Sequence, residues 1–504
     1  TKCPKGKIGY LDFEGYKIYK STDPAFLDGY VITDGHGNKS LFKPVAQFDI
    51  RNDVEGFFPI EVAPGVLYYM GDNKGLRHSW TDYDVVNGQT YYYAVVSYDR
   101  GWAANNMLPS ECTKVIVRDI YGNITLDKNT VMVTPSTPAA GYREPELENG
   151  VQPLPGTVGT GDIRIDIIDP SLVKEGHEYH IVFDDTTQPG SITYSLYDVT
   201  DPSNIKTIFE DSPYINNEDF NPLFDGMRLL VKNDMIAWND SLTGWTKGNC
   251  NLAISVEFES STKYPTPNSL KRQKGYPVSY EIRVGEPDTS WLYNTPRHTT
   301  NFQVWNLVDN EKVRYYLWEE SGKQDSVLSA GDYIEIWLKV NNRWKKIWKI
   351  KFMAPIAEEI INPVAGDRAV IEIDKPFRSG DVFSFRTKAA RVDRQTAKSS
   401  LDRIAVVPNP YVAAATWEPP RLFASGRGER KIDFIHLPQR ATIRIYTMSG
   451  HLVRLIEHDA PMNDGSESWN LTSKDGLDVA AGVYIYHVEA PGVGEKIGKF
   501  AIIK

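Results

Sequence analysis

Apolar and polar residues alternate along most of this chain, in runs that have the length of β-strands. Phe13–Ser21 (FEGYKIYKS), Thr90–Asp99 (TYYYAVVSYD) and Asp162–Asp169 (DIRIDIID) are three of these runs. A period of two residues is typical of strands with one buried face. No long amphipathic helical pattern interrupts the series. The sequence therefore predicts an all-β fold, built from tandem β-sandwich domains.

Polar turns separate the predicted strands, as expected for sandwiches. Residues 143–161 (REPELENGVQPLPGTVGTG) combine Pro, Gly and acidic residues, which is typical of a linker or a long loop. Whether the two central groups of strands share one core stays open. The expected domains are a sandwich over residues 1–120, a linker over 121–161, sandwiches over 162–300 and 301–400, and a small Ig-like domain over 401–504.

Composition and charge narrow the function classes. A length of 504 residues suits about three or four domains. The 28 Tyr and 12 Trp suit pleated sheets. A net charge of −10 without a basic stripe argues against nucleic-acid binding. No run of about 18 apolar residues is present, so we expect no membrane-spanning helix.

Two segments of the first domain carry a family resemblance. GYKIYKS (Gly15–Ser21) and NGQTYYYAVVSYDRG (Asn87–Gly101) resemble strands C and F of fibronectin type III domains. In such domains a tyrosine near the start of strand F anchors the corner by bonding to backbone upstream, and Tyr91 matches that position. This chain departs from the family in a long insertion between the two segments, over residues 22–80.

The insertion contains acidic and amide side chains among glycines. Carboxylate and carbonyl oxygens placed closely together can chelate Ca²⁺, although the spacing is not that of an EF-hand. Asp and Gly are also the ordinary residues of turns, so turn chemistry is the alternative. The candidate calcium ligands are Asp23, Asp28, Asp34 and Asn38.

The chain has an odd number of cysteines, Cys3, Cys112 and Cys250, so they cannot all pair within one chain. Cys3 and Cys112 bracket the first domain, and a disulfide between them would close its ends; free thiols are the alternative. Thr1 opens without an apolar signal core. We therefore expect that a signal peptide has been removed or that the chain is a fragment.

Two prolines flank one asparagine in VVPNPYV (Val406–Val412). Proline fixes φ and lacks a backbone N–H, so this segment cannot be part of a central strand. It makes a stiff entry into the compact β pattern that follows, from Lys431 to Lys504.

That pattern resembles the C-terminal type A sorting domain of the type IX secretion system of Bacteroidetes. The resemblance covers Val406–Lys504, and the flagellar hook-capping Ig-like domain has a similar pattern. The segment Ala413–Lys431 is longer than the family pattern. The residues that carry the match are Pro408, Asn409, Pro410, Gly450, Trp469, Gly482, Tyr484 and Lys499.

The resemblance implies export through the periplasm and the outer-membrane translocon to the cell surface or the medium. It implies translocon components as partners. We expect a structural or adhesive protein of a surface layer or filament, which would pair with itself or with surface glycans. The alternatives are the accessory part of a secreted hydrolase and a carbohydrate-binding protein.

No GxSxG, HExxH or CxxC motif is present, so we expect no enzyme and no cofactor other than the candidate calcium. His177 and His180 would point to opposite faces of a strand, which is poor for chelation. Tryptophans in Trp291–Asn294, Phe302–Asn306 and Arg343–Trp348 could stack on sugars, but buried packing is the alternative. Three Asp-Ser/Thr-hydrophobic tripeptides resemble Bacteroidetes O-glycosylation sites, at Thr186, Ser241 and Ser326.

Overall fold

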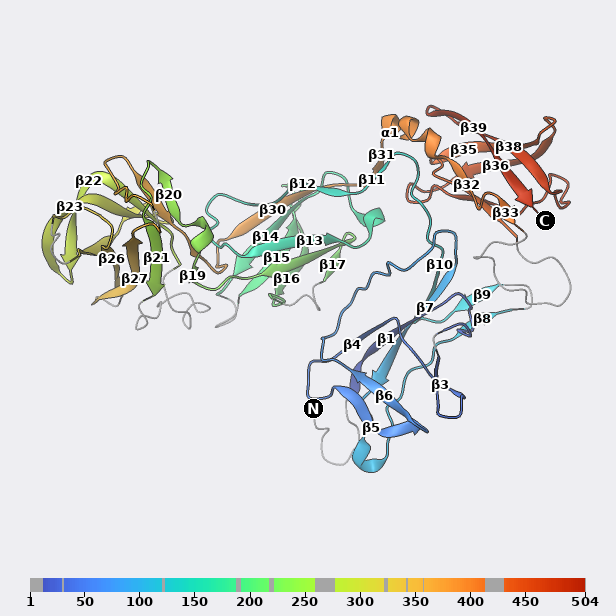
Figure 1. Ribbon diagram of the computed structural model, residues 1–504, viewed down its shortest axis with the longest axis horizontal. Coiled ribbons are helices and arrows are strands. Elements are labelled where there is room, and N and C mark those ends of the chain that lie inside the picture. Colours follow the sequence, from blue (N-terminus) through green and yellow to red (C-terminus); the bar gives the residue numbers. More distant parts are fainter. Residues whose placement is uncertain are drawn as a thin grey trace. The chain divides into compact units, whose positions relative to one another are not determined.

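The computed structural model describes residues 12–29, 31–119, 123–186, 192–216, 222–258, 277–320, 325–340, 343–356, 358–412 and 430–503. The chain divides into two compact units. One unit joins the first part of the chain, Thr1–Glu144, to the last part, Ala390–Lys504, and the other is Pro145–Ala389. Figure 1 colours these segments along the sequence. Among the residues just given, the strands of the sandwiches pair antiparallel, apart from one parallel strand pair, and this confirms the predicted all-β class.

The N-terminal sandwich is built on a four-stranded sheet in the order β10-β7-β1-β4. Tyr19 lies opposite Ala94, and both side chains are buried in one core. These sheet strands are β1 (Phe13–Ser21), β4 (Ala46–Asp49), β7 (Tyr91–Asp99) and β10 (Thr130–Val133). The other elements are β2 (Val31–Thr33), β3 (Lys39–Phe42), β5 (Gly56–Ala63), β6 (Val66–Gly71), η1 (Ala103–Asn105), β8 (Ile116–Arg118) and β9 (Ile124–Leu126).

The predicted linker over residues 121–161 is wrong, because the stretch contains strands. The N-terminal sheet runs on to β10, and β12 (Glu146–Pro153) begins the second unit. β12 lies at the edge of its sheet and pairs only with β30 (Val382–Lys388). An edge strand with few buried positions needs few apolar residues, which is why ELENGVQP has the composition of a loop.

The second unit contains an outer sandwich of two sheets. The five-stranded sheet has the order β12-β30-β14-β15-β16, with β14 (Glu178–Asp184), β15 (Thr193–Asp198) and β16 (Lys206–Ser212). The three-stranded sheet has the order β13-β18-β17, with β13 (Asp162–Ile167), β18 (Met227–Lys232) and β17 (Leu223–Phe224). η2 (Pro170–Leu172) follows β13. Side chains of both sheets share one core, in which Phe183 stacks on Phe377 with centroids 4.0 Å apart.

An inner sandwich is inserted between β18 and β30. Its five-stranded sheet contains β20 (Gly244–Lys247), β28 (Arg368–Ile371), β22 (Tyr280–Leu292), β23 (Thr295–Asn306) and β24 (Glu311–Lys312). Its four-stranded sheet contains β21 (Ala253–Phe258), β27 (Arg343–Met353), β26 (Tyr333–Val340) and β25 (Arg314–Trp318). β19 (Ala237–Trp238) pairs with β29 (Ile373–Asp374), and η3 is Asp240–Leu242.

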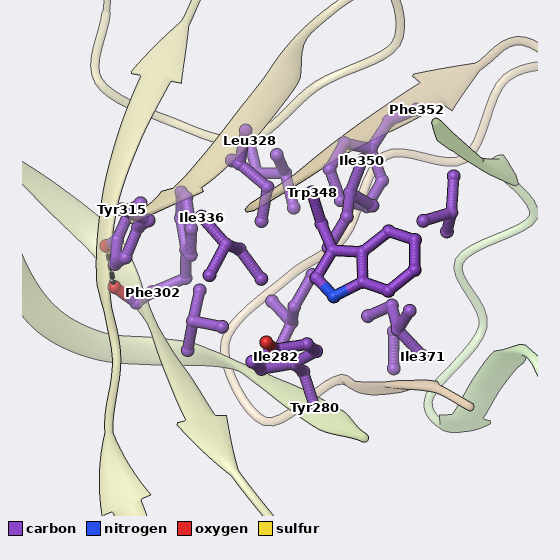
Figure 2. Packing of buried hydrophobic residues seen from close by; sticks show 14 of the residues in the cluster. Tyr280, Ile282, Phe302, Tyr315, Leu328, Ile336, Trp348, Ile350, Phe352 and Ile371 are labelled. Atoms are coloured by element: carbon purple, nitrogen blue, oxygen red, sulfur yellow. Dashed lines mark hydrogen bonds between the residues drawn. The ribbon is translucent and has the colours of Figure 1, made fainter. Parts of the chain in front are cut away.

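The inner sandwich has a core of its own, which Figure 2 shows around Trp348. Tyr280 and Ile282 enter it from one sheet, while Ile336 and Ile350 enter from the other. The buried hydroxyl of Tyr315 donates a 2.6 Å hydrogen bond to the carbonyl oxygen of Phe302, which satisfies the polar end of the ring (Figure 2).

The predicted domain boundary at residue 300 is wrong, because it falls inside β23. β22 and β23 pair across it for most of their length, so both belong to one sheet. Phe377, Phe383 and Phe385 return to the core of the outer sandwich. The two central groups of strands therefore have separate cores. In the chain, the inner sandwich is inserted within the outer one and does not follow it.

The C-terminal sandwich begins after β31 (Arg391–Val392), α1 (Arg394–Ser399) and η4 (Leu401–Arg403). β31 pairs with β11 (Tyr142–Arg143). One sheet has the order β32-β34-β37, with β32 (Ala405–Val407), β34 (Ile432–Ile435) and β37 (Glu467–Trp469). The other has the order β33-β39-β38-β35-β36, with β33 (Tyr411–Val412), β39 (Gly494–Ile503), β38 (Gly482–Ala490), β35 (Arg440–Thr447) and β36 (Leu452–Asp459). Within the described residues, no helix is long and apolar enough to cross a membrane.

Candidate functional site

The double proline connects the two sheets of the C-terminal sandwich. β32 ends at Val407 in the three-stranded sheet, and β33 begins at Tyr411 in the five-stranded sheet. Pro408 and Pro410 lack the N–H that would extend either strand, so the chain leaves one ladder and enters the other. Both flanking strands lie at sheet edges, so the segment is not part of a central strand, as predicted.

Asn409, between the two prolines, is bound to the last strand of the chain. Its Oδ1 accepts a hydrogen bond from the backbone amide of Ala501 at 3.1 Å. Its Nδ2 donates to the backbone carbonyl oxygen of Lys499 at 3.4 Å. Tyr411 then lies opposite Ile502 in a parallel pairing. The asparagine therefore fixes the crossing to β39, while the Lys499 side chain remains exposed.

The aromatic residues of the motif form the core of this sandwich. Trp469 is 1% exposed, and its Nε1 donates to the carbonyl oxygen of Thr472 at 2.9 Å. Tyr484 stacks on Phe500 with centroids 5.7 Å apart, and its hydroxyl donates to the Ala480 carbonyl at 2.8 Å. These roles explain why the fold needs such residues here.

The two glycines of the motif lie at strand ends. Gly450 has φ +84° in the turn between β35 and β36, a conformation that a side chain would strain. Gly482 begins β38. The individual positions thus have structural roles, and the sorting signal stays a prediction from their combination in the sequence.

Residues of the first domain pack against the C-terminal sandwich within the same unit. A cavity of about 420 Å³ lies between them, and Asp433, which is 4% exposed, lines it together with Pro408. Lys431 Nζ donates to the carbonyl oxygen of Gly88 at 3.1 Å and lies 3.4 Å from the Asp433 carboxylate. Sequence reasoning missed this contact, because its partners are 343 residues apart.

A groove of about 530 Å³ in the N-terminal sandwich contains an ion pair between a buried lysine and a half-buried glutamate. Lys17 Nζ lies 3.1 Å from Glu111 Oε1 and 3.6 Å from the centroid of the Tyr68 ring. The hydroxyls of Tyr19 and Tyr68 donate to the same carboxylate at 2.9 and 2.8 Å. Apolar side chains form much of the wall: Ile32, Leu41, Phe42, Val45, Phe57 and Leu67.

Burial dominates the electrostatics of this cluster. It lowers the pKa of the Lys17 ammonium, and Glu111 only partly opposes the shift. It raises the pKa of the Tyr19 and Tyr68 phenols, and the negative Glu111 raises both further. Lys17, Tyr19 and Tyr68 all donate to the Glu111 carboxylate, which therefore links β1 and β6 to the segment before β8.

The four candidate calcium ligands are engaged in local turns. Asp28 accepts from the backbone and hydroxyl of Thr22 and from the Ser21 hydroxyl; these bonds outweigh burial and lower its pKa. Asp23 accepts from backbone amides at 3.2 Å. Hydrogen bonds from Asn38 lower the pKa of Asp34.

Among the described residues, no three His, Cys, Asp or Glu side chains gather closely enough to hold a metal ion. The turn hydrogen bonds of these side chains are in the structure, and calcium at this insertion stays a prediction. His177 and His180 each lie beside their own carboxylate, Asp198 at 2.9 Å and Glu178 at 3.7 Å.

The anchoring role predicted for Tyr91 has a counterpart in the structure. Its phenol oxygen accepts a 2.9 Å hydrogen bond from the backbone amide of Val86, five residues upstream. β1 also pairs directly with β7, as strands C and F of a fibronectin type III domain would. The fibronectin assignment itself stays a prediction.

Cys3 lies outside the described residues, so its disulfide with Cys112 stays a prediction. Cys112 is exposed and Cys250 is buried, and the described part of the chain contains no disulfide at either.

Thr186 and Ser241 are exposed and Ser326 is half-buried, so all three lie where a glycan could be attached. Glycopeptide mass spectrometry that finds all three bare would remove this prediction.

Of the tryptophans that the sequence proposed for sugar stacking, one is buried and three are half-buried. Trp348 is 2% exposed, and Trp305 lies 4.3 Å from the Arg283 guanidinium. Trp291 and Trp344 enclose the guanidinium of Arg314, at 4.1 and 3.9 Å. The buried-packing alternative therefore holds for Trp348, while the half-buried tryptophans have one ring face against an arginine side chain.

A different aromatic group lies on the outer face of the inner sandwich, and the sequence analysis did not single it out. Trp318 is 37% exposed and stacks on Tyr333, with centroids 5.8 Å apart. Tyr316 meets Trp318 edge to face at 4.9 Å. In register, Trp318 pairs with Tyr333 and Tyr316 with Glu335. In VRYYLWEE, Tyr316 and Trp318 are two residues apart, which places both rings on one face of a strand. This alternation is the sequence signal from which the group could have been predicted.

Comparisons with known proteins give no assignment. No protein-family profile and no curated protein matches the chain. Among solved structures, it is similar to PorZ, a bacterial surface component of the type IX secretion system of Porphyromonas gingivalis. That match has 12% identity, covers 83% of this chain and 51% of that chain, and has a TM-score of 0.18.

Two further structures are also similar. Dimeric latent PorU from Porphyromonas gingivalis has 12% identity, 75% and 35% coverage and a TM-score of 0.14. A tetra-tandem repeat in the extending region of a large adhesion protein has 11% identity, 97% and 92% coverage and a TM-score of 0.12. The chain thus spans about half of the PorZ chain and about a third of the PorU chain. TM-scores this low carry no argument about function.

Proposed function

We propose that this chain is a secreted or cell-surface protein of the type IX secretion route, and that residues 401–504 are its sorting domain. One observation carries the proposal: the motif residues from Val406 onward form a sandwich of their own, in which Pro408, Asn409 and Pro410 join the two sheets. A domain with its own hydrophobic core suits a signal that the translocon recognises after the protein has folded in the periplasm.

The remaining sandwiches serve a structural or adhesive role and no catalysis. One observation supports this proposal: Glu111, which lines the groove of about 530 Å³, is bound by Lys17 and by two tyrosine hydroxyls. Sheet edges such as β10 offer unpaired backbone groups through which copies of the chain could associate.

Export is tested with the full chain behind a signal peptide, in a bacterium with a type IX system and in its translocon-deleted derivative. Immunoblots of surface and medium should find the protein only when the translocon is intact. Lys499→Ala should reduce export, whereas Lys474→Ala, an equally exposed change outside the motif, should not. Equal export from both strains would overturn the proposal.

The structural role is tested by electron microscopy of the protein taken from the cell surface. Filaments or lattices are expected. Isolated monomers would remove the assembly role and leave glycan binding as the reason for surface display.

Glycan binding is the second candidate, favoured by the exposed Trp318–Tyr333–Tyr316 group. Aromatic faces beside charged side chains can stack on sugar rings and hydrogen bond to their hydroxyls, and Lys349 Nζ lies 3.9 Å from the Tyr333 ring centroid. Affinity electrophoresis in surface polysaccharides should show retardation that Trp318→Ala removes. Tyr293→Ala, at a ring 61% exposed outside this group, is the control. Equal migration of wild type and Trp318→Ala would exclude the site.

A further inference from the structure

The segment that follows β10 packs against the C-terminal sandwich within the same unit. We call Thr134–Tyr142 (TPSTPAAGY) the strap; it leads from β10 to β11. Ala139 and Ala140 are 2% and 6% exposed, so its centre is buried. Backbone bonds join it to the C-terminal sandwich: Gly465 N to Thr137 O (2.6 Å), Ala139 N to Met462 O (3.0 Å) and Ala140 N to Leu437 O (2.9 Å). The strap thus binds to the loops of the sandwich through three backbone hydrogen bonds, without forming a strand of either sheet.

The two surfaces approach so closely that glycine is required on each side. A Cβ on Gly465 would lie 2.5 Å from the carbonyl oxygen of Pro138. A Cβ on Gly88, which has φ +85°, would lie 2.7 Å from Asp433 Oδ2. The Pro138 oxygen belongs to the backbone and cannot move aside, whereas the Asp433 oxygen ends a side chain, so at Gly88 the positive φ is the stronger constraint. Packing this tight is typical of an interior, and not of two domains that only touch.

Polar groups add specificity beside the strap. Lys431 bridges the Gly88 carbonyl and the Asp433 carboxylate, and Ser468 Oγ donates to Asp433 Oδ1 at 2.5 Å. Because Asp433 is 96% buried, it requires these partners, and separation of the two surfaces would remove Lys431 from the Gly88 oxygen.

The strap also holds the point at which the chain enters the C-terminal sandwich. Tyr142 pairs with Val392, and the Asp393 amide donates to the carbonyl oxygen of Gly141 at 2.8 Å. The boundary between the two compact units lies just before this point, between Ala389 and Ala390. A cut at the boundary would therefore leave every strap contact in place.

We propose that the strap retains the C-terminal sandwich on the protein without the covalent connection, so that cleavage between Ala389 and Ala390 does not release it. In the proposed function, which this inference extends, the sorting domain then stays on the displayed protein and becomes part of its structure. The partner that the strap fits is this chain's own C-terminal sandwich.

The test uses purified full-length protein with a site-specific protease sequence inserted between Ala389 and Ala390. After cutting in native buffer, residues 1–389 and 390–504 should co-elute on size exclusion and appear as one mass in native mass spectrometry. Denaturant should separate them. Elution of the C-terminal piece alone from native buffer would overturn the proposal.

Substitutions show whether the strap is responsible. Gly465→Val should weaken the cut complex at least tenfold, while Gly476→Asn, at an open turn with φ +77°, should leave it intact. If Gly465→Val does not fold, Lys431→Met tests the same surface, because Lys431 lies beside the strap and contacts Gly88. Unchanged association in both variants would overturn the role of the strap. The assay involves no secretion, so a failure of the export proposal leaves its outcome untouched.

Discussion

The side-chain oxygen Oδ1 of Asn233 accepts a 2.8 Å hydrogen bond from the backbone amide of Phe377, 144 residues further along the chain. Close by, the Thr160 hydroxyl accepts from the Lys375 amide at 2.7 Å. The chain therefore leaves the outer sandwich and returns to it at almost the same place. Such a neck makes the inner sandwich an insertion, of the kind that exposed loops tolerate.

We expect the outer sandwich to fold without its insertion. Its core draws only on residues 147–231 and 377–385, so replacing residues 235–374 by a short Gly/Ser linker removes no core side chain. Circular dichroism and urea unfolding should show a cooperative β domain. The control is a longer deletion that also removes β30. This variant should not fold, because β30 is a central strand of the five-stranded sheet. If the first deletion also fails to fold, the two sandwiches depend on each other.

The strands could largely be predicted from the sequence, whereas their partners could not. Alternation in EYHIVFDD or RWKKIWKIKFM is local, and both became strands. Pairing depends on residues far away: β14 lies beside β30, about 200 residues later, and this nesting leaves no local signal. Lys17 is a second example. The sequence places it in a strand, but its partner Glu111 lies 94 residues away and could not be predicted locally.

Removal of one partner of the Lys17–Glu111 pair should destabilise the N-terminal sandwich. Lys17→Met leaves the carboxylate with its two tyrosine donors, whereas Glu111→Gln leaves a buried ammonium uncompensated. We expect Glu111→Gln to cost about 3 kcal/mol, and Lys17→Met to cost less. Urea unfolding measures both, and the double variant should cost less than the sum of the two. Additive costs would show that the pair does not interact.

Alkaline pH should destabilise the same sandwich. Burial and Glu111 raise the pKa of Tyr19 and Tyr68 in the folded state, so their contribution is complete below the ordinary pKa of 10.0. Above it the unfolded chain loses protons that the folded chain keeps, and stability falls by about 1.4 kcal/mol per pH unit for each tyrosine. Lys17 and Lys114, whose pKa burial lowers, act in the opposite direction below pH 10.5.

Denaturant unfolding between pH 9 and 12 measures this slope. Tyr68→Phe removes one of the two ionising phenols and should make the decline shallower. An unchanged slope in this variant would place the alkaline transition elsewhere, for example at Tyr179 or Tyr315, whose pKa is also raised by burial.

The crossing at Asn409 should control the order of the last strand. Asn409→Ala removes the acceptor for the Ala501 amide and the donor to the Lys499 carbonyl, whereas Asn409→Asp keeps the acceptor alone. Because the side chain is exposed, we expect a loss of about 1 kcal/mol for alanine. Hydrogen exchange at Ala501 should accelerate about fivefold in Asn409→Ala and less in Asn409→Asp. Equal acceleration in both variants would mean that the donated bond holds β39 and that the acceptor contributes little, contrary to the geometry at Ala501.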